Sequence, residues 1–329
     1  MQDLIHLLDD YLTAGPPESP LSLQFTLRCH PRRMRIPGCT HCPGKLVLPT
    51  TCLSFLGIEL DTAQWEAWLP ADKLPELRHL LCMFTSRSSC TKRDLLSLLG
   101  KPNFAASVVV AGRTFMRCLW HCASSVPELY HHVKLTAPGE ADLQWWKYLL
   151  SQWNGRSFFL HQHLSPASSL HLYTDAAGSI GYGAFLNSRW FCGTWTDTQK
   201  AFCIQYMELY PIALACSTWG PEWSSRRIEF HSDNQAVVAA LRSGTCRCAN
   251  VMSLLRTMFV VCAVNNFTVT ASYIPGKANL IADCLSRQNL AAFRRLAPHA
   301  TTIPATPRPL PVIPGEALAA PCSSTPSKH

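Results

Sequence analysis

Charged residues are scarce in this 329-residue chain, at 15% of the sequence, and 21 Asp and Glu are outnumbered by 29 Lys and Arg. Hydrophobic residues make up 47%, which excludes an intrinsically disordered polymer and indicates folded domains. The length is enough for two domains with cores of their own. The net charge of +8 favours a polyanionic partner, although many basic proteins never bind nucleic acid.

Long apolar runs are missing as well. No stretch approaches the roughly 18 apolar residues that a membrane span needs. The first residues, Met1–His6, have neither the basic start nor the apolar core of a secretory signal. We therefore expect an intracellular protein of the cytoplasm or nucleus, neither secreted nor bound to a membrane. Its 16 cysteines are scattered, and in a reducing compartment we expect free thiols.

Residues 165–290 alternate between strand and helix patterns. Leu170, Leu172 and Thr174 alternate with His171, Tyr173 and Asp175. This period of two predicts a strand with two unlike faces that ends at Asp175. Residues 182–186 and 189–192, separated by a two-residue turn, predict two further strands of an antiparallel meander.

Three more acids stand at the ends or starts of later elements. A helix is predicted over 204–219, with Pro211 near its first turn. A strand over 227–233 is followed by a helix over 234–241, and a Pro-Gly turn after residue 273 leads into the last helix. With Asp175, these elements hold one carboxylate each: Glu208, Asp233 and Asp283.

Four carboxylates in such settings suit a two-metal phosphodiester site. Mg²⁺ prefers hard oxygen ligands and keeps several waters. Two ions roughly 3.5–4 Å apart activate an attacking water and stabilise the leaving oxygen. Taken singly, each acid fits a turn, a helix cap or a solvated helix face equally well.

The motifs around these acids, in this order and spacing, resemble type 1 ribonuclease H as retroelements carry it. They are Thr174-Asp-Ala-Ala-Gly178, Met207-Glu-Leu209, His231-Ser-Asp-Asn234 and Ile274-Pro-Gly-Lys-Ala-Asn-Leu-Ile-Ala-Asp-Cys-Leu-Ser-Arg287. The resemblance implies an α/β (α+β) fold, a ribonuclease H-like mixed five-stranded sheet with flanking helices.

The same resemblance implies a function. Asp175, Glu208, Asp233 and Asp283 would bind two Mg²⁺ ions, for which Mn²⁺ can substitute, and the enzyme would cleave the RNA strand of RNA–DNA hybrids. The nucleic-acid contacts expected from the motifs are Asn234, Gln235, Lys277 and Arg287. Many relatives carry a histidine where this chain has Lys277, so we expect slower product release or metal exchange.

The first half of the chain resembles a reverse transcriptase. Residues 4–17 predict a hairpin with Asp9 and Asp10 in its turn, similar to the Tyr-x-Asp-Asp hairpin of polymerase palms, although an ordinary polar tip fits the pair as well. Two strands over 53–69 are similar to the hairpin that holds the primer end. A helix over 92–99, capped by Thr91 and ended by Gly100 and Pro102, leads to helices over 104–122, broken near Gly112, and 140–153, as in a thumb.

We therefore divide the chain into a partial palm (1–70), a thumb- or connection-like region (71–160), a ribonuclease H-like domain (165–290) and a Pro-rich disordered tail (291–329). The whole resembles the polymerase–ribonuclease H protein of retroelements mobilised by a tyrosine recombinase.

Two departures shape the functional prediction. The strand that carries the third polymerase carboxylate has no counterpart, so we expect reverse transcription to be lost through truncation. Cysteines and histidines at residues 29–42 allow a zinc site, but their spacing fits no standard finger and drifted sequence accounts for them as well. The leading hypothesis is an RNA–DNA hybrid endoribonuclease, and the alternative is a catalytically silent, nucleic-acid-binding relic.

Overall fold

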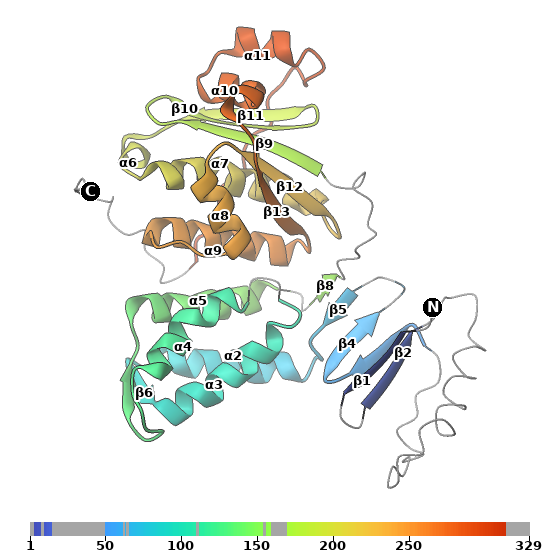
Figure 1. Cartoon of the computed structure of the whole chain (residues 1–329), viewed down its shortest axis with the longest axis vertical. Helices are drawn as coiled ribbons and strands as arrows, with labels where there is room; N and C mark the ends of the chain where they lie inside the picture. Colours follow the sequence, from blue (N-terminus) through green and yellow to red (C-terminus); the bar gives the residue numbers. More distant parts are fainter. Residues whose placement is uncertain are drawn as a thin grey trace. The chain divides into compact units, whose positions relative to one another are not determined.

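The predicted strands and helices can be compared with a computed structural model of the chain (Figure 1). The structure describes residues 3–7, 10–14, 50–61, 63, 66–109, 112–153, 156–158 and 170–313, with backbone alone for 3–7, 10–14 and 156–158. The chain divides into two units, residues 1–70 and 71–329. In the part of the chain that is described, no helix is both long and apolar enough to cross a membrane.

The first unit contains short antiparallel strands. β1 (Asp3–Leu7) pairs with β2 (Asp10–Ala14), which forms the hairpin expected there. The two strands predicted over 53–69 are three: β3 (Cys52–Phe55), β4 (Ile58–Asp61) and β5 (Glu66–Trp68). The prediction was wrong because it missed a turn at Leu56 and Gly57, whose φ angles of 51° and 75° are both positive, as a tight hairpin requires.

The second unit begins with helices and short strands. Their bounds are α2 (Lys73–Thr85), β6 (Ser89–Thr91), α3 (Lys92–Ala105), η2 (Thr114–Met116), α4 (Arg117–Ser124), β7 (His132–Lys134), α5 (Ala137–Gln152) and β8 (Arg156–Phe158). Thr91 caps α3 as predicted, accepting a hydrogen bond from the backbone of Asp94 at 3.2 Å. The predicted end of this helix was wrong, since α3 continues through Gly100 and Pro102 to Ala105 and buries Leu99 and Pro102 on the way.

The rest of the second unit is built on one five-stranded mixed sheet. Its order is β11-β10-β9-β12-β13, with β9, β10 and β11 antiparallel and β12 parallel to both β9 and β13. The strands are β9 (Leu170–Ala177), β10 (Gly181–Leu186), β11 (Arg189–Thr194), β12 (Arg227–Ser232) and β13 (Thr268–Tyr273). The predicted α/β class and the five-stranded mixed sheet with flanking helices are confirmed.

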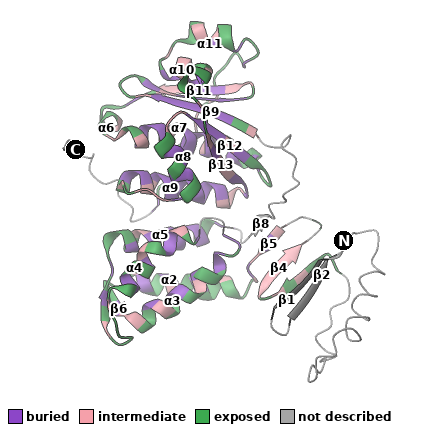
Figure 2. Ribbon diagram, viewed as in Figure 1, coloured by how far each residue is buried: buried purple, intermediate pink, exposed green. Residues whose placement is uncertain are grey.

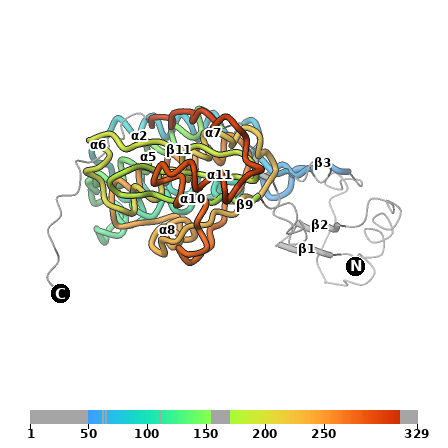
Figure 3. The backbone as a smooth tube through the Cα atoms, turned by 90° about the horizontal axis from the view of Figure 1, so that it is seen from above, coloured from blue at the N-terminus to red at the C-terminus, as the bar shows by residue number. Residues whose placement is uncertain are grey.

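Helices cover both faces of this sheet (Figure 1), and the view from above shows α10 lying over the strands that it contacts (Figure 3). One side carries α7, α8 and α9, and the other carries α10 and α11, with α6 after the last meander strand. Their bounds, with two short 3₁₀ turns, are α6 (Asp197–Lys200), α7 (Ile204–Trp219), η4 (Gly220–Glu222), α8 (Gln235–Ser243), α9 (Ala249–Val264), η5 (Gly276–Ala278), α10 (Leu280–Ser286) and α11 (Leu290–Leu296).

Helix α7 is buried on nearly every side (Figure 2). Pro211 lies inside it, about two turns from Ile204 rather than in the first turn, so its predicted position was wrong. A proline there leaves the Met207 carbonyl without its usual backbone donor. Burial of Leu209, Ile212 and their neighbours opposes that loss.

Residues expected to begin a disordered tail are packed instead. Phe293 of α11 is fully buried with Phe185 and Trp190, and Arg294 lies over the Trp190 ring at 5.0 Å. The following extended segment bonds back to the sheet edge through Ala305 N and Trp190 O, at 2.8 Å. The segment is ordered because its side chains pack on aromatic residues of the sheet and its backbone bonds the edge strand β11. Composition alone did not indicate these contacts. The tail beyond residue 313 lies outside the described residues.

A buried ion pair joins α5 to α9. Arg256 donates to Asp142 at 2.6 Å, and both side chains are at most 6% exposed. Trp145 donates its indole N–H to the Arg256 carbonyl at 2.9 Å. Burial raises the pKa of Asp142, and the neighbouring guanidinium opposes that shift. Removing one partner of such a pair leaves a charge in a dry environment.

The substitution Asp142→Ala is therefore expected to lower the free energy of unfolding by about 3–5 kcal/mol. Chemical denaturation of the full chain measures the change. Glu222→Ala is the matched control, because it removes the exposed partner of Arg189 and should change the free energy by less than about 1 kcal/mol. Equal losses in the two variants would contradict the assigned importance of the buried pair.

Candidate metal centre

Three of the four acids singled out in the sequence come together. Asp175 lies near the end of β9, Glu208 in the first half of α7 and Asp233 directly after β12. One ligand oxygen from each lies within 4.8 Å of the other two. The cause is topological: β9 and β12 run parallel as neighbours, so their carboxyl ends meet at one edge of the sheet, where α7 brings Glu208.

Asp175 is 7% exposed and is held by a hydroxyl group. Ser286, the last residue of α10, donates its Oγ–H to Asp175 Oδ2. Burial raises the pKa of Asp175, the Ser286 hydrogen bond lowers it, and the nearby charges of Asp233 and Asp283 raise it again. Gly183 faces Asp175 across the sheet, and an added Cβ there would meet Leu285 Cβ at 2.3 Å. A glycine at 183 thus lets α10 approach closely enough for Ser286 to reach Asp175.

Glu208 is the most perturbed acid of the group. Burial first, then the charges of Asp175 and Asp233, raise its pKa to about 8, while a hydrogen bond with the Ala176 backbone works against them. Among the described residues, no group donates a hydrogen bond to its buried Oε2. A carboxyl oxygen that is buried, accepts no hydrogen bond and lies close to two other acids is in a position that a cation would stabilise.

Asp233 is half-buried and lies against Gly276 of η5. An added Cβ at Gly276 would stand 3.0 Å from Asp233 Oδ2, a tight contact that would require the carboxylate to shift by a few tenths of an ångström. The next residue, Asn234, caps α8 by accepting hydrogen bonds from the backbone of Ala236 and Val237.

Asp283 stands apart from the three acids. It lies in α10, and its Oδ1 accepts a hydrogen bond from Arg287 Nε at 2.7 Å. It is not one of the three acids whose ligand oxygens lie within 4.8 Å of each other. Its charge nevertheless acts on Asp175, since it contributes to the raised pKa of that group.

Two polar residues that support the site were missed in the sequence. Ser286 bonds Asp175, and Asn279 donates from Nδ2 to the Thr174 carbonyl at 2.8 Å, which ties the start of α10 to β9. A signal was available: Ser286 follows Asp283 by three residues, a spacing that places both on one face of a helix.

The donor set fits hard divalent cations. Three carboxylates, two of them mostly buried, offer oxygen ligands of the kind that Mg²⁺ and Mn²⁺ take. The unbonded Glu208 Oε2 is the observation that favours a cation at this position. Such a centre suits hydrolytic chemistry on phosphate esters.

The residues predicted to contact nucleic acid lie at the start of α8, in η5 and at the end of α10. Gln235, Lys277 and Arg287 are exposed, whereas the Asn234 side chain is occupied as a helix cap. Elsewhere, Asp10 was predicted to lie in the hairpin turn, but it is the first residue of β2, paired with Leu7, and its side chain is not described. Asp9 and the cysteines and histidines at 29–42 lie outside the described residues.

Comparisons with known proteins give structural likenesses alone. No family model and no curated protein matches the chain. It is similar to a foamy viral protease-reverse transcriptase dRH in complex with ds DNA, at 15% identity and a TM-score of 0.36, over 80% of this chain and 44% of that one. It is also similar to a foamy viral protease-reverse transcriptase in complex with RNA/DNA hybrid, at 15% identity and a TM-score of 0.35. That match covers 80% of this chain and 34% of the viral chain.

A third likeness is to RNase H1 from the archaeon Halobacterium salinarum NRC-1, at 17% identity and a TM-score of 0.31, over 37% of this chain and 98% of that one. The chain thus spans less than half the length of both foamy viral chains. At these identities and TM-scores the likenesses carry no argument about activity, which depends on the side chains described above.

The raised pKa of Glu208 gives a prediction for the metal-free protein. The folded state keeps a proton that the unfolded chain releases between pH 4.5 and about 8, so Glu208 makes the fold less stable as pH rises through this window. In EDTA at pH 8, Glu208→Gln should therefore raise the free energy of unfolding by roughly 1–4 kcal/mol.

Denaturation curves at pH 8 and pH 4 measure this effect, which should be close to zero at pH 4, below the ordinary pKa of 4.5. Glu222→Gln, at an exposed position, is the control and should show no such pH dependence. A Glu208→Gln variant that is no more stable than the wild type at pH 8 would show that Glu208 does not bear this electrostatic strain.

Proposed function

We propose that this chain is a ribonuclease H-like nuclease that uses divalent metal ions to cleave the RNA strand of RNA–DNA hybrids. The observation that carries the proposal is the convergence of Asp175, Glu208 and Asp233 from three separate elements, with their ligand oxygens within 4.8 Å of one another. Like charges do not gather in a largely buried place without a compensating partner. The order and spacing of the four motifs support the same activity.

The proposed metal ligands are Asp175, Glu208 and Asp233, with Asp283 completing a two-ion set for Mg²⁺ or Mn²⁺. When bound, the ions activate the attacking water and neutralise charge on the leaving oxygen. Ser286 orients the Asp175 carboxylate through its hydroxyl. Glu208 would hold an ion as its carboxylate, because only that form coordinates well. Asp283, which pairs with Arg287 in this structure, would complete the set.

We propose that the substrate is read through its backbone. An RNA–DNA hybrid is close to A-form, so phosphates and 2′-hydroxyls rather than base edges are the accessible features. Gln235, Lys277 and Arg287 are exposed beside the metal centre and offer an amide, an ammonium and a guanidinium for such contacts. Asn234 adds a contact with the substrate at the start of α8, the helix that it caps. The net charge of +8 is consistent with a polyanion.

The same proposal includes an origin in a retroelement of the tyrosine-recombinase type, with residues 1–70 derived from a palm and 71–160 from a thumb. DNA synthesis is not part of it. Primer extension by the full chain is expected to stay at background level.

A cleavage assay tests the nuclease. The full chain with Mg²⁺ should cut the labelled RNA strand of a hybrid and leave double-stranded DNA intact. Asp175→Asn should slow cleavage at least about 100-fold, because it weakens several kcal/mol of charge stabilisation. Asp197→Asn, which changes an exposed carboxylate of the same unit, should cleave as the wild type does. If the wild type and Asp175→Asn give the same background, the proposal is wrong.

One observation favours a second candidate, a silent protein that binds nucleic acid without turnover. Asp283 pairs with Arg287 instead of joining the other three acids. Cleavage by the wild type separates the two candidates. For the nuclease, Arg287→Ala should retain cleavage and bind the hybrid more weakly, because it frees Asp283 and removes a phosphate contact. Hybrid binding by the wild type with no cleavage in either Mg²⁺ or Mn²⁺ would select the silent protein.

A further inference from the structure

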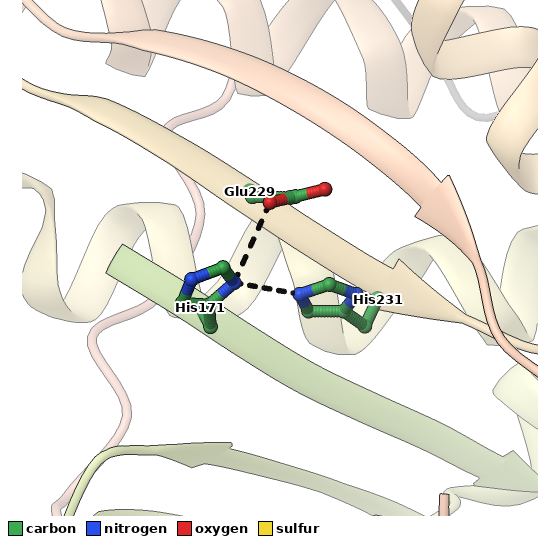
Figure 4. Close-up of side chains that lie close together, drawn as sticks. All are labelled: His171, Glu229 and His231. Atoms are coloured by element: carbon green, nitrogen blue, oxygen red, sulfur yellow. Dashed lines mark hydrogen bonds and ion pairs between the residues drawn. The ribbon is translucent and has the colours of Figure 1, made fainter. Parts of the chain in front are cut away.

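A second cluster of metal-ligating side chains lies on the same two strands as the carboxylates. His171 is on β9, and Glu229 and His231 are on β12 (Figure 4). The strands pair in parallel with His171 opposite Glu229 and Tyr173 opposite His231. Side chains two apart on a strand share a face, so all three project from the face that also carries Asp175.

The ligand atoms of this cluster point at one another. His171 Nδ1 lies 2.9 Å from His231 Nε2 and 3.4 Å from Glu229 Oε2, and the three atoms fall within 4.8 Å of each other. Ligands held about 2.05 Å from a tetrahedral Zn²⁺ are about 3.3 Å apart. The distance from His171 to Glu229, 3.4 Å, is already close to this value. The distance between the two histidine nitrogens, 2.9 Å, requires the rings to move slightly apart.

The surroundings hold His231 in the orientation of a ligand. Its Nδ1 is 2.8 Å from Ser272 Oγ, and its ring stacks on Tyr173 at 4.6 Å with an angle of 16°. A metal-binding histidine characteristically donates its other N–H to a neighbouring oxygen, which leaves the remaining nitrogen unprotonated. In the tautomer in which Nδ1 donates its proton to Ser272, Nε2 carries the lone pair, which faces His171 Nδ1 across the 2.9 Å hydrogen bond between the two rings.

We propose that His171, Glu229 and His231 form a second metal site, which binds Zn²⁺ in preference to Mg²⁺. Two imidazoles and one carboxylate suit a borderline cation, whereas the carboxylate centre offers hard oxygen alone. The His171 and Glu229 side chains are 46% and 32% exposed, so an ion reaches them from solvent and a water fills the fourth position.

The two sites are separate along the strands. His171 precedes Asp175 by four residues, or about 13 Å of strand, and His231 precedes Asp233 by two, or about 7 Å. A zinc ion bridging β9 and β12 would link the strands that end at two of the proposed Mg²⁺ ligands. The inference stands on its own residues and holds whether or not the chain cleaves RNA.

Zinc titration of the metal-free full chain tests the proposal, with excess Mg²⁺ present to occupy the carboxylate centre. The wild type should take up one more Zn²⁺ than His171→Ala. Loss of an outer-shell partner of a metal ligand costs about 10–100-fold in affinity, so Ser272→Ala should weaken this ion to that extent and the ligand variant Glu229→Gln by more. His171 is exposed, and circular dichroism checks that its variant remains folded.

Two controls separate this site from others. Asp175→Asn and His299→Ala, at the carboxylate centre and at an exposed histidine, should bind this zinc as the wild type does. Cys203 and Cys248, whose sulfurs lie 3.7 Å apart, could also attract zinc. Co²⁺ as a probe distinguishes them, because thiolate charge-transfer bands should be unchanged by His171→Ala while the cobalt d–d absorption of a nitrogen–oxygen site is lost.

Equal zinc stoichiometry and affinity in the wild type and His171→Ala would overturn the proposal. So would loss of the same ion in Asp175→Asn, since that result would assign the zinc to the carboxylate centre.

Discussion

The parallel pairing of β9 with β12 is the constraint on which both candidate metal sites depend. Parallel neighbours bring their carboxyl ends to one edge of the sheet, so Asp175 and Asp233 meet although 58 residues separate them in the chain. The same register sets His171 opposite Glu229 and brings His231 within reach. A slip of one residue would turn every side chain of one strand to the opposite face and would abolish both clusters.

Gathering acids at this edge is unfavourable for the metal-free fold, and the raised pKa values of Glu208 and Asp175 are the sign of that strain. The surrounding structure holds the acids together nonetheless. Helix α7 is buried on nearly all sides, so Glu208 cannot move away without exposing apolar surface. On the other face, Gly183 lets α10 pack close to the sheet, and Ser286 neutralises part of the strain at Asp175. Local instability at a site of this kind is common where a ligand restores the balance.

The helical region before the sheet is also part of the framework of the site. The Asp142–Arg256 pair and the Trp145 hydrogen bond join α5 to α9, and α9 packs along α7, which carries Glu208. A polar contact buried this deeply tolerates few alternative arrangements, because each alternative would leave a charge unpaired. The position of Glu208 thus depends on residues far from it in sequence.

The sequence by itself determined the meander strands, the helices α7 and α8, the strand β12 between them and the acids that these elements carry, because side-chain periodicity is a local property. It also placed the Thr91 cap. It did not indicate α6 or α9. Other features were decided only by tertiary structure. The interior position of Pro211 and the packed segment around Phe293 depend on contacts distant in the chain. The Asp283–Arg287 pair is a local contact, because residues four apart meet on one helix face. The cluster of His171, Glu229 and His231 was decided by tertiary structure, since it follows from cross-strand register, which no local pattern specifies.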